Sequence, residues 1–243
     1  MQCAPSFLIK YGNRLTSGLS DHDWERWKPQ IEVIQLKTGN ILFDAGQSVQ
    51  HVYFPLSGII SQQYEFADGK SAEFAQMGNE GMAGVCVFMG NSSTSSKALV
   101  LANGVAYRLS TYWMQKEFNA SSSFRQLILH YMHILMTNAS QLAVCNRRHT
   151  IDQQLCRTLL LQLERVAGDE LALTHDLISR SMGVRREGVS EAAKRLERMG
   201  AIAYSRGHIH VLDRSALLRN TCECYESIKK EHHKLLPQEY KTV

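Results

Sequence analysis

Hydrophobic positions change their spacing along this chain. Between residues 31 and 110, short runs rich in β-branched and aromatic residues alternate with glycine-containing turns, such as those at 38–40 and 78–81. From 118 to 150, and again from 152 onwards, apolar residues recur every three or four positions. The first pattern predicts short strands and the second predicts helices. We therefore expect an α+β protein whose strands precede most of its helices.

The strand-like runs follow one another closely, and this favours an N-terminal antiparallel β-barrel or double-sheet jelly roll. The expected strands lie within 31–36, 41–46, 51–58, 59–66, 71–77, 97–102 and 105–110. Before them, Ser20 can cap a short helix over 21–30, since acidic residues follow it in the first turn.

A long helix is expected over 118–149, with Asn146–Thr150 as a hinge at its end. Its apolar positions alternate spacings of four and three, which is a heptad-like seam. The seam consists of Ile128, Met132, Leu135, Ala139 and Leu142. The helix either lies on its own barrel or joins two protomers.

The segment 174–196 has the pattern of a helix-turn-helix. Gly183 stands where a first helix must stop and reverse, and a left-handed backbone is easiest for glycine. The second helix exposes arginine, glutamate and lysine, which can read base edges or hold phosphates. The expected DNA-contacting residues are Thr174, Arg185, Arg186, Glu187, Ser190, Glu191 and Lys194. The alternative interpretation is an amphipathic helical hairpin whose charged face only contacts solvent.

The residues after the hairpin favour DNA binding. Segments 201–204 and 208–212 alternate like two strands around the turn 205–207, which predicts a winged helix with Arg206 and His208 at the DNA backbone. Helix-turn-helix proteins usually read two half-sites, so we expect a homodimer on a palindromic promoter site. A ligand-sensing module that regulates a protein partner through the winged helix is the alternative. An enzyme is disfavoured, because no nucleophile–base pair or phosphate loop has a usable spacing.

Composition agrees with a soluble regulator. The net charge of +4 permits nucleic-acid binding without requiring it. No stretch approaches the roughly 20 apolar residues of a membrane span, and no signal peptide is evident, so a cytoplasmic protein without membrane contact is expected.

The six cysteines are scattered, and most should be free, buried thiols. Cys222 and Cys224 form a C-x-C pair with His232 and His233 downstream, but this differs from the usual zinc spacing, so we expect no metal.

The order of glycine-punctuated barrel, long helix and winged helix resembles the Crp/Fnr superfamily of bacterial transcription regulators. The resemblance rests on Gly39, Gly46, the run 52–58, the run 78–84 and the segment 174–197. It implies a sensor domain over 1–117, a dimerisation helix with its hinge over 118–149, and a DNA-binding domain with a helical tail over 150–243. The resemblance also implies RNA polymerase as a further candidate partner. Gly188 departs from the Thr or Ser that is common in the family.

In this family the barrel often binds a cyclic nucleotide through Gly-Glu-Leu and Arg-Ser-Ala elements. Met82 stands where the glutamate would be, and Ser96 stands where the arginine would be. The candidate effector pocket therefore consists of Glu80, Gly81, Met82, Ser96 and Lys97, with Glu80 and Lys97 close enough to substitute after a shift in register. Because lysine lacks the bidentate fork of arginine, we do not expect a cyclic nucleotide in this pocket, and we expect no cofactor elsewhere. The pocket is then vestigial, accepts another ligand or only supports the dimer.

Overall fold

The computed structural model describes residues 8–67, 71–90, 93–166 and 168–236. These residues form two compact units. One unit takes the described residues up to Tyr64, those from Ala75 to Leu135 and those from His232 onwards; the other takes Glu65–Phe74 and Met136–Glu231 as far as they are described. Each unit has a hydrophobic core of its own.

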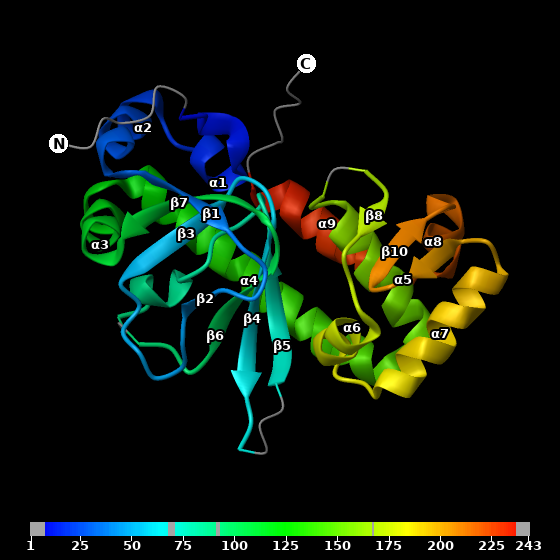
Figure 1. Ribbon diagram of the computed structural model, residues 1–243. Coiled ribbons are helices and arrows are strands. Elements are labelled where there is room, and N and C mark those ends of the chain that lie inside the picture. Colours follow the sequence, from blue (N-terminus) through cyan, green and yellow to red (C-terminus); the bar gives the residue numbers. More distant parts are fainter. Residues whose placement is uncertain (1–7, 68–70, 91–92, 167, 237–243) are drawn as a thin grey trace. The chain divides into compact units, whose positions relative to one another are not determined.

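Short helices precede the strands of the first unit (Figure 1). They are η1 (Lys10–Gly12), α1 (Arg14–Ser17), α2 (Asp21–Trp27) and η2 (Lys28–Gln30). The Ser20 side chain accepts a hydrogen bond from the backbone N–H of Asp23 at 3.0 Å, so the predicted N-cap is confirmed.

The strands between residues 32 and 110 form two sheets, which is the double-sheet form of the expected fold. The strands are β1 (Glu32–Leu36), β2 (Ile41–Phe43), β3 (His51–Pro55), β4 (Ile59–Glu65), β5 (Ser71–Met77), β6 (Lys97–Ala102) and β7 (Gly104–Ser110). One sheet has the order β1-β7-β3 and the other the order β2-β6-β4-β5. The β1–β7, β3–β7, β2–β6 and β4–β6 pairs are antiparallel. The strand positions agree with those predicted from the alternation of apolar residues.

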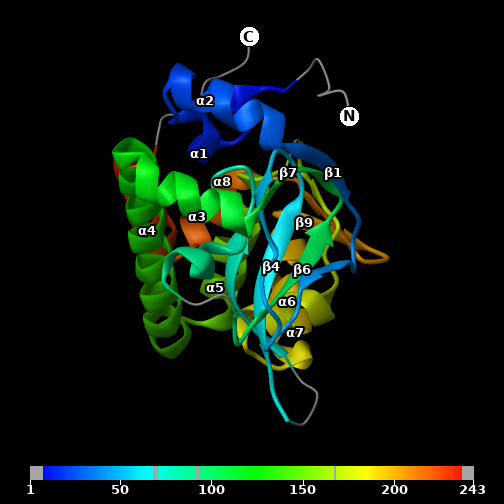
Figure 2. The ribbon, with the colours of Figure 1, turned by 90° about the vertical axis from the view of Figure 1, so that its left-hand side faces the viewer.

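The helical region after the sheets is divided, whereas the sequence predicted one helix over 118–149. α3 (Thr111–Ala120) ends at Ser121, which has an extended backbone, and α4 (Ser122–Arg148) follows (Figure 2). The Ser121 hydroxyl accepts from the N–H of Phe124 at 3.2 Å, so this serine starts α4. The 3-10 helix η3 (Val85–Phe88) lies earlier in the chain, between β5 and β6.

The predicted hinge at Asn146–Thr150 is shorter than expected. α4 continues through Arg148, and Thr150 already caps α5 (Ile151–Leu163) through a capping box with Gln153. Only His149 and Thr150 lie between the two helices. The polar residues 146–148, which were predicted to belong to the hinge, are exposed residues in the last turn of α4.

The second unit contains the helices and strands expected of a winged helix. After α5 come β8 (Glu170–Leu171), α6 (His175–Met182), α7 (Arg186–Arg198), β9 (Ile202–Ser205), β10 (His208–Val211), α8 (Arg214–Asn220) and α9 (Cys224–Leu235). The small sheet has the order β8-β10-β9. The predicted helical tail is thus two helices, separated by residues 221–223.

Candidate nucleic-acid interface

The turn between α6 and α7 has the geometry that the sequence predicted. Gly183 has a φ of 66°, in the left-handed region, and ends α6. The N–H of Val184 donates to the carbonyl of Ser179 at 3.1 Å, which closes the turn. Thr174 caps α6, since its hydroxyl accepts from the N–H of Leu177 at 3.1 Å. The Thr174 hydroxyl is therefore engaged in the fold, although the residue is exposed.

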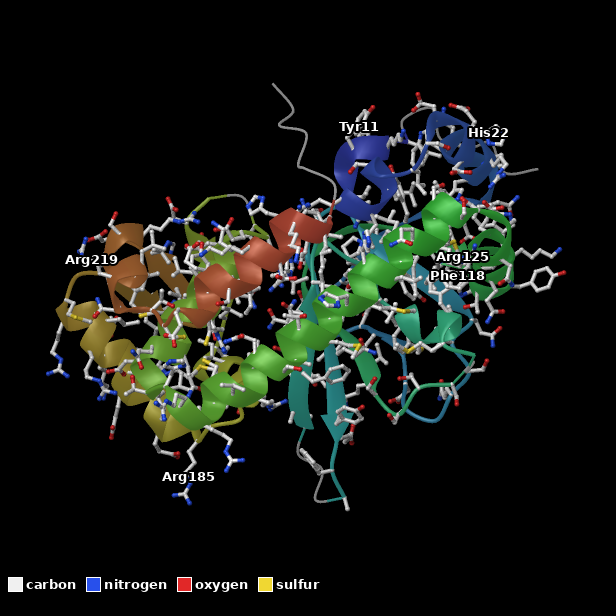
Figure 3. The ribbon with its side chains drawn as sticks, turned by 180° about the vertical axis from the view of Figure 1, so that it is seen from behind. Tyr11, His22, Phe118, Arg125, Arg185 and Arg219 are labelled. Carbon is white, nitrogen blue, oxygen red and sulfur yellow. The ribbon has the colours of Figure 1, made fainter. Side chains whose placement is uncertain are left out.

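α7 has one buried face and one charged face. Val189, Ala192, Ala193 and Leu196 are at most 1% exposed and pack into the core of the second unit. The opposite face carries exposed side chains from Arg185, Arg186, Glu187, Glu191 and Lys194. Arg185 extends away from the domain at the start of the helix (Figure 3). These five predicted contact residues lie on a surface that the domain's own packing leaves open.

Ser190, also predicted to contact DNA, makes a contact inside the domain. Its Oγ lies 2.9 Å from Nδ1 of His175, and the His175 ring stacks on Tyr204 of β9 with centroids 4.1 Å apart. His175 thus connects α6, α7 and the wing. Burial, together with the charges of Arg186 and Lys194, lowers the pKa of His175. The sequence analysis missed this role, because nothing local marks a histidine that bridges three elements.

Gly188, which departs from the family pattern, faces inwards. A Cβ at this position would lie 2.8 Å from Cδ1 of Ile151, at the start of α5. The glycine therefore belongs to the packing of α7 against α5. Its departure from Thr or Ser removes no side chain from the charged face.

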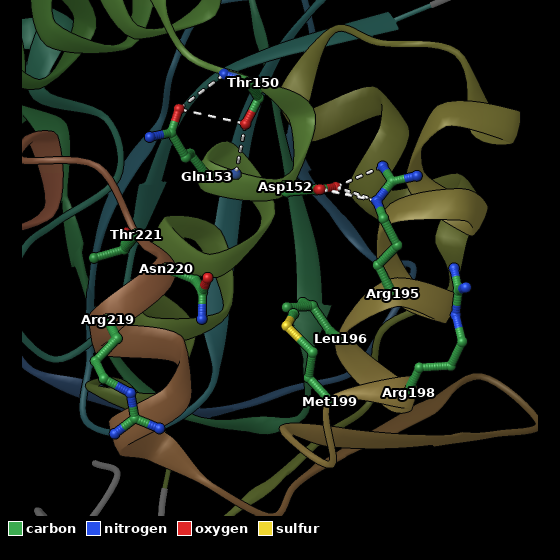
Figure 4. Close-up of a pocket in the computed structure, with 10 residues that line it drawn as sticks. All are labelled: Thr150, Asp152, Gln153, Arg195, Leu196, Arg198, Met199, Arg219, Asn220 and Thr221. Atoms are coloured by element: carbon green, nitrogen blue, oxygen red, sulfur yellow. Dashed lines mark hydrogen bonds and ion pairs between the residues drawn. The ribbon is translucent and has the colours of Figure 1, made fainter.

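A bidentate ion pair also holds α7 to α5. Arg195 Nε donates to Asp152 Oδ2 at 2.8 Å, and Arg195 Nη2 donates to Asp152 Oδ1 at 2.6 Å (Figure 4). The pair lines a cavity of about 670 Å³ that Arg198, Met199 and Arg219 also border. Neither Arg195 nor Asp152 was singled out from the sequence, because their pairing depends on tertiary structure.

The wing places its two predicted residues differently. Arg206 is exposed at the tip, with a φ of 44°, and Gly207 follows with a φ of 88°. His208 instead lies on β10, where its Nδ1 is 2.8 Å from a carboxylate oxygen of Glu170 on β8. Arg206 remains available to a phosphate, whereas Glu170 competes for His208.

The candidate effector residues are tightly packed in the first unit. Met82 is fully buried, and Ser96 is 2% exposed and accepts a hydrogen bond from Gln62 at 3.0 Å. The Glu80 carboxylate accepts from the N–H of Gly78 at 3.1 Å. Lys97 follows Ser96 directly, is the first residue of β6 and is partly buried. A neutral hydroxyl thus occupies the position at which the resemblance calls for an arginine.

Comparisons with known proteins agree with this geometry. The model of the cyclic nucleotide-binding domain matches residues 33–119, and that of the Crp-like helix-turn-helix domain matches residues 153–219. No curated protein matches the chain.

Solved structures share the fold over most of the chain. A crp/fnr-family regulator from Eubacterium rectale is 15% identical, with a TM-score of 0.68 over 85% of this chain and 96% of its own. FixK2 from Bradyrhizobium japonicum is 15% identical, with a TM-score of 0.67 over 79% of this chain and 98% of its own. The c-di-GMP-responsive regulator CLP from Xanthomonas campestris is 16% identical, with a TM-score of 0.63 over 80% and 100% of the two chains.

A winged helix-turn-helix with an open charged face, following a domain of the cyclic-nucleotide-binding fold, defines a DNA-binding transcriptional regulator. Within that class, the chain belongs to the Crp/Fnr family. Among the described residues, the structure contains no helix that is long and apolar enough to cross a membrane.

Proposed function

We propose that the protein binds promoter DNA as a homodimer, with α7 in the major groove and the tip of the wing on the phosphate backbone. The observation that carries this proposal is the division of α7 into a buried apolar face and an exposed charged face. Arg186 and Glu187 are suited to base edges, and Lys194 and Arg206 to phosphates. Ser190 and His208 support the domain instead, since His175 and Glu170 engage them.

The dimer face that we propose is shifted from the predicted seam. Ile128 and Met132 are 0% and 9% exposed, because they pack into the core of their own domain. Leu129 is 46% exposed and Met136 is 68% exposed. Ala143, also exposed, continues their spacing of seven residues along α4. These three residues form an apolar stripe that a second α4 could cover, with partly buried Leu135, Ala139 and Leu142 beside it.

We expect no response to cyclic AMP or cyclic GMP. The anionic cyclic phosphate needs a positive charge, and the buried Ser96 supplies only a hydroxyl at that position. The regulator would act on DNA in the cytoplasm, either constitutively or under another signal. RNA polymerase is the partner that an activator bound at a promoter would contact.

Selection of bound genomic fragments, followed by footprinting, tests DNA binding. Arg186→Ala should weaken protection of the selected site. Arg219→Ala is the matched control, because Arg219 is an exposed arginine of α8 at another end of the same domain (Figure 3). Equal footprints for the two variants would contradict the role of Arg186. No selected fragment would favour the alternative, a sensor that binds a protein partner.

Light scattering tests the dimer separately. Met136→Glu should shift the protein from dimer to monomer. Tyr112→Glu on α3 should not, although Tyr112 is 69% exposed and also apolar in character. A dimer that survives Met136→Glu would place the interface elsewhere.

A further inference from the structure

Four side chains that can bind a metal lie together in the second unit. Cys145 belongs to the last turns of α4, His149 directly follows that helix, and Cys222 and Cys224 stand where α8 gives way to α9. Their ligand atoms all lie within 4.8 Å of one another. The three cysteines are buried and His149 is partly buried.

The distances between these atoms suit a single tetrahedral ion. Cys145 Sγ lies 3.6 Å from Cys222 Sγ, and Cys224 Sγ lies 3.6 Å from His149 Nδ1. Around Zn²⁺, bond lengths of about 2.3 Å to sulfur and about 2.0 Å to nitrogen place two sulfurs about 3.8 Å apart and a sulfur and a nitrogen about 3.5 Å apart. An iron–sulfur cluster would need more widely spaced cysteines, since they bind different iron atoms.

Neighbouring groups already orient the ligands. Nε2 of His149 lies 3.2 Å from a carboxylate oxygen of Glu223, so that nitrogen is the one suited to carry the proton. The lone pair of Nδ1 is then directed at Cys224, on the side of the thiols. Gln141 Nε2 donates to Cys224 Sγ at 3.0 Å, a contact that stabilises a thiolate. A carboxylate behind a histidine and a donor behind a thiolate are typical surroundings of a zinc site.

Charge gives a second, independent indication. Arg157 is 3% exposed, and its Nε and Nη1 have no hydrogen-bond partner among the described residues. Arg157 lies close enough to the Cys145 sulfur to interact with it electrostatically. A buried cation is costly without a nearby negative charge. Zn²⁺ with three thiolates and a neutral histidine would carry a net charge of about −1 and so supply it.

We propose that Cys145, His149, Cys222 and Cys224 hold one Zn²⁺ ion in a closed tetrahedral site. Binding would displace the protons of the three thiols, with no change in oxidation state. Because all four positions are filled by protein, the site is structural, and it ties the end of α4 to the start of α9. The expectation of no metal arose because the sequence shows only the C-x-C pair, while the other ligands come from a distant helix.

Metal analysis of the full-length chain, purified without chelators, tests the site. We expect about one zinc per chain in the wild type and a loss of most of it in Cys145→Ser and Cys222→Ser. Cys156→Ser is the matched control, since Cys156 is fully buried in the same unit but is not among the four ligands. Glu223→Gln should keep the metal but weaken its affinity by about 10- to 100-fold.

Cobalt substitution of the wild-type protein provides a readout that does not depend on how the ligand variants fold. Co²⁺ added to metal-free wild-type protein should give the thiolate charge-transfer and d–d bands of a tetrahedral site, and Cys156→Ser should give the same bands. Equal zinc content in wild type and Cys222→Ser, iron with acid-labile sulfide, or a Cys145–Cys222 disulfide with no metal would each overturn the proposal. Neither readout involves DNA, so the metal site and the proposed DNA binding can fail separately.

Discussion

The hydroxyl of Tyr131 donates a hydrogen bond of 3.0 Å to the carbonyl oxygen of Met82. Tyr131 belongs to α4, and Met82 lies in the loop where family members hold a cyclic nucleotide. This loop therefore touches the long helix directly, inside the first unit. A change in the loop could act on α4 without an intervening element, which is the simplest route for a signal to reach the proposed dimer stripe.

Gly81→Ala should destabilise the first unit through this contact. A Cβ at position 81 would lie 2.4 Å from the Tyr131 hydroxyl oxygen and 2.8 Å from two ring carbons, in a fully packed environment. Overpacking of this kind costs about 1–3 kcal/mol. Urea denaturation of Gly81→Ala, Tyr131→Phe and the double variant would measure the coupling. Strictly additive losses of unfolding free energy would show that the side chains at positions 81 and 131 do not interact.

The lowered pKa of His175 predicts that the stability of the second unit depends on pH. Because the pKa of His175 is lowered in the folded state, the unfolded chain binds more protons than the folded chain does just below pH ~6.5. The stability contributed by the neutral ring is thus fully present above about pH 6.5 and is lost as the pH falls towards the folded pKa. His175→Gln should flatten this part of the profile. An identical slope in wild type and variant, measured by urea unfolding at pH 7 and pH 5.5, would rule out this contribution.

The two types of contact that hold α7 to the domain should differ in strength. The side chains of Arg195 and Asp152 are 43% and 37% exposed, so solvent screens their ion pair, and Asp152→Asn should cost less than about 1 kcal/mol. Leu196 is fully buried, and Leu196→Ala should cost about 2–5 kcal/mol. Denaturation midpoints of the two variants would compare them. A larger loss for Asp152→Asn would mean that the ion pair, and not apolar burial, fixes the helix.

The sequence was sufficient where the decisive pattern is local. Alternation located the strands, Gly183 located the turn, and Ser20 located the start of a helix, because each depends on residues within a few positions of one another. It failed for the seam of α4, since helical spacing does not show whether Ile128 or the adjacent Leu129 faces the protein's own core. It also missed His175 and the cysteine–histidine cluster, whose partners come from other elements and meet only after folding.

Salt dependence should separate base contacts from phosphate contacts on α7. Lysine and arginine at phosphates release counterions, so log affinity falls linearly with log salt concentration. Lys194→Gln should weaken binding to all sequences and reduce the slope by about 1 per subunit, whereas Arg186→Ala should cost about 1–3 kcal/mol at the specific site and relax base preference there. Fluorescence anisotropy with specific and scrambled duplexes at several salt concentrations measures both effects. If Lys194→Gln left the slope unchanged while altering base preference, the roles assigned to these two exposed side chains would have to be exchanged.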